Sequence, residues 1–163
     1  MKIGELFEAT AADNADTSDL DDSLNDFFDP TQLTRWENFT IQNRGMIAFA
    51  KSVLKDDSYQ DALQQNLKRI GIPNQVLVFR GHLKSSPAIG TGQTFANVTL
   101  RRSLAKNFRQ AKFISLPGGQ TKGIDKKDWI VSKIRIKRDD IIAHGNTQES
   151  EFIILAKKAK IQK

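Results

Sequence analysis

The chain has 163 residues, no cysteine and a formal net charge of +6. This length suits one domain that buries its own core, and the lack of cysteine excludes disulfides, thiolate metal sites and cysteine nucleophiles. Only His82 and His144 could supply imidazole, so no metal site is expected. No stretch reaches the ~20 apolar residues that span a bilayer and no signal segment is evident, which predicts a soluble, cytoplasmic protein.

Charge is distributed unevenly along the sequence. Residues 1–33 carry nine acidic side chains and one basic side chain, whereas residues 34–163 carry 24 basic and 10 acidic groups, a net charge of +14. A basic body attracts polyanions such as nucleic acid, and an acidic segment can screen that field or dock elsewhere. Such charge also serves solubility alone, so it does not select a function by itself.

Two parts are predicted along the chain. Residues 1–29 are rich in Asp, Asn, Ser and Thr and hold few large apolar groups, so we expect an acidic, flexible tail with one short amphipathic element near 18–28. Residues 30–163 are predicted to form a single domain.

The first part of that domain, residues 30–72, is predicted to be a helical layer. Asp29 followed by Pro30 suits a helix start, because an N-cap residue precedes a proline in the first turn. Apolar residues at helical spacing predict two further helices, over 41–55 and over 57–69.

The second part, residues 74–162, changes to short segments typical of strands. Strands are predicted at 75–80, 94–99, 112–116, 129–137, 140–143, 151–156 and 159–162, with one helix at 100–109. Residues 117–128 are predicted to form a flexible, basic, glycine-containing loop, either a solvated hairpin connection or a mobile flap over a phosphate-bearing ligand. Helices followed by strands predict an α+β fold.

Glu149 and Glu151 stand two residues apart at the start of the apolar run 152–155. Because strand side chains alternate, both carboxylates would point to the same side at the edge of a sheet. Together they could handle a cation and a proton. Taken alone, such a pair is also a common surface pattern.

Three motifs of potential chemistry occur in a fixed order: Arg80-Gly81 at the end of an apolar strand, Phe95-Ala-Asn97-Val-Thr99 before a helix that contains Phe108, and Glu149-Ser-Glu151. This set resembles the Arg, Ser-Thr-Ser, Glu-x-Glu class of mono-ADP-ribosyltransferases, which includes arginine-modifying bacterial toxins and phage-encoded enzymes that modify host proteins. The resemblance covers roughly residues 74–161. It implies a helical layer followed by a split two-sheet, mostly antiparallel β core.

The resemblance assigns catalysis to two residues. Glu151 would stabilise the positive charge that develops on the nicotinamide ribose as nicotinamide leaves, in the way that carboxylates act in glycosidases. Glu149 would orient and deprotonate an incoming arginine. A glutamate at position 149 is what resembles the arginine-specific members.

The resemblance also assigns the NAD-binding residues: Arg80, Gly81, Asn97, Thr99 and Phe108. Arg80 offers a planar fork of donors to the phosphates of NAD and stays charged. Asn97 stands where the family has its first serine. Its amide both accepts and donates hydrogen bonds, so it could brace the catalytic glutamate or the ribose.

The implied activity moves ADP-ribose from NAD, the substrate, to an arginine of a target protein and uses no metal. The target would belong to the transcription or translation machinery of a host cell, with the protein acting in the host cytoplasm. Other readings stay open: a nucleobase or water as the acceptor, or an inactive basic protein that binds nucleic acid or ribosomes.

Overall fold

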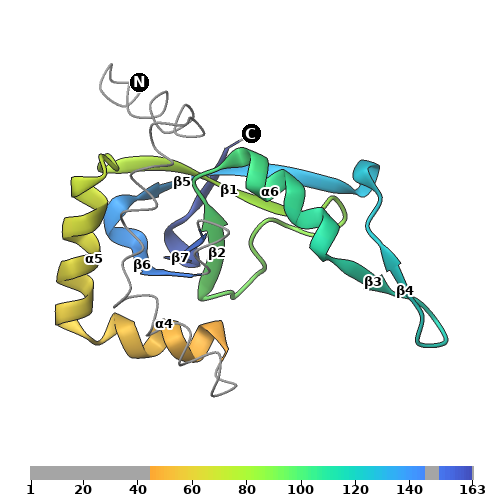
Figure 1. Ribbon diagram of the computed structural model, residues 1–163, viewed down its shortest axis with the longest axis horizontal. Coiled ribbons are helices and arrows are strands. Elements are labelled where there is room, and N and C mark those ends of the chain that lie inside the picture. The colour runs from red at the N-terminus through yellow and green to blue at the C-terminus, as the bar shows by residue number, and fades with distance from the viewer. Residues whose placement is uncertain (1–44, 146–150, 163) are drawn as a thin grey trace.

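The computed structural model describes residues 45–145 and 151–162 (Figure 1). It opens with two helices, α4 (Met46–Leu54) and α5 (Asp57–Arg69). The Asp56 carboxylate accepts a hydrogen bond from the Tyr59 N–H and caps α5. The helix predicted over 57–69 is therefore confirmed, and α4 lies within the range predicted over 41–55. The helix predicted from Pro30 and the acidic tail lie outside the described residues.

Six strands form the main sheet: β1 (Gln75–Leu83), β2 (Phe95–Thr99), β5 (Trp129–Lys137), β6 (Ile141–His144), β7 (Glu151–Leu155) and β8 (Lys160–Gln162). Their order is β6-β7-β2-β1-β5-β8, and every neighbouring pair is antiparallel. The prediction of an α+β fold with a mostly antiparallel sheet is confirmed.

The sheet comes close to dividing between β1 and β2. β1 pairs with β5 along its whole length, and β2 pairs with β7 along its whole length. By contrast, β1 and β2 are joined by a single residue pair, Phe79 with Thr99. The sheet therefore consists of two three-stranded halves, β6-β7-β2 and β1-β5-β8, and we call the boundary between β1 and β2 the seam. Along the seam, backbone N–H and C=O groups need hydrogen-bond partners other than a neighbouring strand.

Helices α4 and α5 cover the half of the sheet that contains the edge strand β6 (Figure 1). Phe49, Val53, Leu63 and Leu67 carry their buried faces. The side-chain amides of Gln60 and Gln64 donate to the carbonyl oxygens of Ile142 and Ile141 at 2.8 and 3.1 Å. These bonds cover part of the edge strand, which would otherwise expose backbone acceptors.

Helix α6 (Arg102–Asn107) and the 3-10 turn η2 (Phe108–Ala111) pack beside β1 and β5 (Figure 1). The predicted helix at 100–109 thus starts later, since Leu100 is buried ahead of it. The Trp129 Nε1–H donates to the Ala105 carbonyl at 3.1 Å. A Cβ on Gly81 would lie 2.2 Å from that same oxygen and 2.5 Å from the Trp129 ring, so only glycine allows this close packing.

A separate two-stranded ribbon, β3 (Phe113–Ser115) with β4 (Thr121–Gly123), projects from the body of the protein (Figure 1). The strand predicted at 112–116 contains β3, and the basic loop predicted over 117–128 also contains β4 and the 3-10 turn η3 (Lys126–Asp128). Gly118 and Gly119 make the turn of the ribbon with φ of 87° and 81°. All of β4 is exposed, so its residues show no apolar alternation from which a strand could be predicted.

Two further 3-10 turns, η4 (Arg138–Asp140) and η5 (Ala156–Lys158), connect the last strands. Within the described ranges, no helix is both long enough and apolar enough to cross a membrane.

Candidate functional site

A cavity of about 380 Å³ lies at the seam between the two halves of the sheet. Five of the residues predicted from the three motifs line it: Arg80, Gly81, Asn97, Phe108 and Glu151. Its volume falls within the range of small-molecule sites, which is about 300 to 1,000 Å³. Residues from the β1-β5-β8 half and from the β6-β7-β2 half thus share one concave surface.

Glu151 opens β7 and is only 7% exposed. The Asn97 side-chain amide donates a hydrogen bond to Glu151 Oε1. This bond fixes the orientation of the carboxylate, which also lies against the backbone of Gly145. A buried carboxylate held by a donor is oriented without cost at the moment of reaction, which is what electrostatic catalysis requires.

Gly145 makes room for that carboxylate. A Cβ at Gly145 would lie 2.7 Å from Glu151 Oε2 and 2.8 Å from its carboxyl carbon. The Gly145 N–H also donates to the Glu151 carbonyl oxygen at 2.7 Å, which ties the end of β6 to the start of β7. Any larger residue at position 145 would push the Glu151 side chain out of its place.

Arg80 crosses the seam. Its Nη1 donates to the Asn97 carbonyl oxygen at 2.6 Å, so a side chain satisfies a backbone acceptor that the regular ladder leaves open. Burial lowers the pKa of the Arg80 guanidinium, and the nearby Glu151 carboxylate opposes that shift. An arginine nevertheless keeps its charge at neutral pH.

Arg80 retains further donor capacity. Its Nε is buried and has no hydrogen-bond partner among the described residues. A charged group in this state is stabilised by a neighbouring anion. Because Arg80 lines the cavity, its guanidinium charge favours an anionic ligand there.

Thr99, which the resemblance assigns to NAD binding, lies away from the cavity. Its side chain is fully buried, it does not line the cavity, and its Oγ1 accepts a hydrogen bond from the Arg101 N–H at 3.1 Å. Thr99 stands at the one bridge between β1 and β2, and its hydroxyl holds the chain where β2 turns toward α6. Gly81 lines the cavity. Because it has no side chain, the Trp129 ring can pack closely against it.

Glu149 lies outside the described residues, so its predicted role stays a prediction. Motif reasoning missed four residues at the site: Gly145, and Met46, Lys112 and Trp129, which line the cavity. Of these four residues, Trp129 was the easiest to single out from the sequence, because a tryptophan at the start of a predicted strand is a large side chain that must pack against other groups. Nothing in the sequence singled out the other three.

The chain matches no protein-family model, no curated protein and no solved structure. In the described part of the chain, no group of three or more His, Cys, Asp or Glu side chains is placed to hold a metal ion. The geometry around Arg80, Asn97 and Glu151 is therefore the feature of the protein that bears on its function.

Proposed function

We propose that the protein cleaves NAD between nicotinamide and ribose and transfers ADP-ribose to an arginine of a target protein. The observation that carries this proposal is the meeting of Arg80, Asn97 and Glu151 at one cavity. These residues come from three separate strands and correspond, in order, to the three motifs of the mono-ADP-ribosyltransferase resemblance. An ADP-ribosyltransferase-like fold is part of the proposal, and the near division of the main sheet supports it.

Each residue has a distinct task in this scheme. Arg80, which lines the cavity, binds the phosphates of NAD through its charge. Phe108 and Trp129 offer aromatic surface to the nicotinamide ring. Asn97 holds the Glu151 carboxylate in place, and that carboxylate opposes the positive charge that develops on the ribose.

The transfer breaks one bond at the ribose carbon of NAD and forms another at the same carbon. The bond from the ribose carbon to the nicotinamide nitrogen breaks, and its electron pair leaves with nicotinamide. A guanidinium nitrogen of the acceptor forms the new bond to the same carbon. The proton that this nitrogen loses goes to the Glu149 carboxylate, which the Glu-x-Glu spacing places two residues from Glu151.

The acceptor is tested with NAD labelled in its adenosine part, incubated with the protein and a cell lysate. We expect label on protein, and we expect Glu149→Gln to lose this label while slow release of nicotinamide continues. Equal loss of transfer and release in Glu149→Gln would contradict the acceptor role of Glu149. Label on nucleic acid alone would replace arginine by a nucleobase as the acceptor.

A nucleobase is the second candidate acceptor, and one observation favours it. A second hollow, whose lining includes the cations Arg102, Lys106, Arg109 and Lys126, adjoins the cavity and shares Trp129 with it. The other rival is a catalytically inactive protein that binds nucleic acid or ribosomes, and release of nicotinamide by the wild-type protein would exclude that rival.

A further inference from the structure

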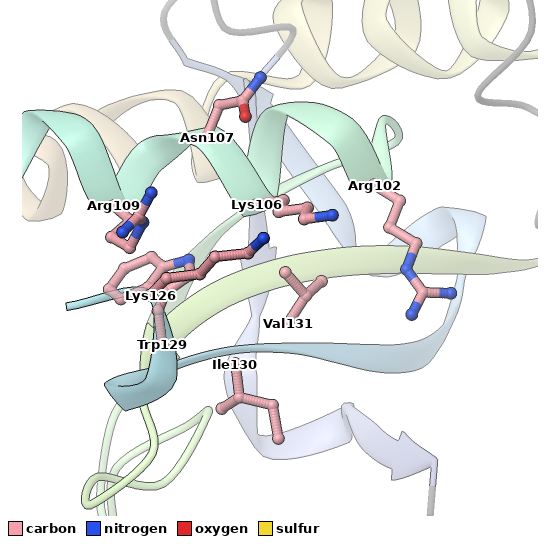
Figure 2. Close-up of a pocket in the computed structure, with 8 residues that line it drawn as sticks. All are labelled: Arg102, Lys106, Asn107, Arg109, Lys126, Trp129, Ile130 and Val131. Atoms are coloured by element: carbon pink, nitrogen blue, oxygen red, sulfur yellow. The ribbon is translucent and has the colours of Figure 1, made fainter. Parts of the chain in front are cut away.

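A second hollow, of about 460 Å³, lies between α6 and β5. Four of its lining residues are cationic and come from three elements: Arg102 and Lys106 from α6, Arg109 from η2, and Lys126 from η3. In Figure 2, Lys106 and Lys126 extend toward its middle, and Arg109 and Arg102 lie toward its two ends. We call this surface the basic groove.

The positive charge of the basic groove is not neutralised within the described part of the chain. No acidic residue lines it, and none of its four cations forms an ion pair with a described residue. Among the described residues, the one polar contact made by these four side chains is a hydrogen bond from Arg109 Nη1 to the Ile124 carbonyl oxygen at 3.4 Å. Asp125, the acidic residue beside Lys126, pairs instead with Lys122 at 3.5 Å.

This arrangement costs folding stability. Arg102 and Lys106 stand four residues apart on α6, and Lys106 and Arg109 stand three apart. Like charges at these spacings repel each other on a helix. An anion in the groove would remove that cost, so the charges favour a ligand over an empty surface.

The shape of the charge distribution indicates a chain of phosphates. Figure 2 shows Arg102 and Arg109 toward opposite ends of the groove, with Lys106 and Lys126 between them. Successive phosphates of a strand can contact such a row of cations. Trp129 and Val131, which lie on the α6 side of β5 in Figure 2, supply aromatic and apolar surface in the same groove.

We propose that the basic groove binds a single strand of nucleic acid through its phosphate backbone. Cations that follow a backbone, together with aromatic surface for bases, form the usual site for single strands. Since Trp129 also lines the cavity that contains Glu151, the bound strand lies beside the proposed site of transfer. On the proposed function, this placement selects a target that is nucleic acid or is bound to nucleic acid.

Binding is tested by fluorescence anisotropy with a labelled single-stranded oligonucleotide of about twelve nucleotides, within the usual site sizes. The double variant Lys106→Gln and Lys126→Gln should weaken binding by roughly tenfold at moderate salt. The slope of log K against log salt should fall by about 0.7 for each lost contact, hence by about 1.4. Both lysines are exposed, so their replacement should leave the fold intact.

The matched control is Lys51→Gln with Lys55→Gln, the same loss of charge at exposed positions of α4. It should leave the salt slope unchanged. A loss equal to that of the groove variant would show that only net charge matters and would overturn the proposal. Competition by an oligomer of glutamate as strong as that by unlabelled oligonucleotide would overturn it as well.

Two results separate the groove from the NAD site. Glu151→Gln should bind the oligonucleotide as the wild-type protein does, so a failure of the NAD proposal would leave the groove standing. If the groove variant instead lost affinity for NAD and kept its affinity for the oligonucleotide, the groove would serve the phosphates of NAD and this inference would be wrong.

Discussion

Asn97 connects the two charged groups of the candidate site through two different parts of one residue. Its carbonyl oxygen accepts from Arg80, and its side-chain amide donates to Glu151. The backbone of β2 therefore positions the proposed NAD anchor, and the side chain of the same residue positions the proposed catalytic carboxylate. The departure from the family's serine leaves this bracing function possible, since an amide donates as a hydroxyl does.

The residue-scale prediction concerns that amide. Asn97→Ala should lower the rate of NAD cleavage by roughly 10- to 100-fold, because a hydrogen bond to a charged group is worth about 1.5 to 3 kcal/mol. The affinity for NAD should change little, since the backbone bond to Arg80 stays. Steady-state kinetics check this, with Gln65→Ala, an exposed change on α5, as the control. An unchanged rate would show that Glu151 needs no support from Asn97.

At the scale of elements, the close packing of α6, β1 and β5 depends on Gly81. Gly81→Ala should lower the free energy of unfolding by about 1 to 3 kcal/mol, the usual cost of inserting a methyl group into a packed region. The Ala105 carbonyl is backbone and cannot move aside cheaply. Denaturant unfolding measures the change.

Gly123→Ala is the matched control for that experiment, because a Cβ at Gly123 meets nothing within 4 Å. Its effect should stay within about 0.5 kcal/mol, as for other surface substitutions. Equal destabilisation by both variants would show that the tight contact around Gly81 does not matter.

The elements differ in how far the sequence predicts them. Helix α5 lies where it was predicted, over about 57–69, because its apolar residues keep helical spacing and Gly71 and Pro73 follow it. Strand β3 lies within the strand predicted at 112–116, whereas β4 was not predicted, because its three exposed residues carry no apolar alternation. At the site, motifs predicted Arg80, Asn97 and Glu151. They could not predict Gly145, whose importance comes only from its contact with Glu151 in the fold.

At the scale of the whole molecule, the single bridge between β1 and β2 makes the seam the weakest joint of the sheet. A ligand that contacts Arg80 on one half and Glu151 on the other would tie the halves together. Binding to the folded state stabilises it by mass action, by about 2.7 kcal/mol at a ligand concentration of one hundred times Kd.

The single bridge between β1 and β2 leads to a prediction about local opening of the sheet at the seam. NAD should slow hydrogen exchange at the amides around Phe79, Arg80 and Asn97, because opening of the seam would require loss of the ligand. Arg80→Lys keeps the charge but loses the planar fork, so it should lose most of this protection. Amide exchange followed by mass spectrometry measures the effect. Protection spread evenly over all strands, or none at all, would place the NAD site elsewhere.

The central claim is that Glu151 enables cleavage of NAD at the cavity between the halves of the sheet. Release of nicotinamide from NAD, followed over time, tests it most directly in the wild-type protein, in Glu151→Gln and in Asp139→Asn, an exposed acidic residue of η4. We expect release by the wild-type protein and by Asp139→Asn. Glu151→Gln should lose at least about 100-fold in rate, as expected for a main electrostatic group. No release by the wild-type protein, or equal release by Glu151→Gln, would contradict the claim.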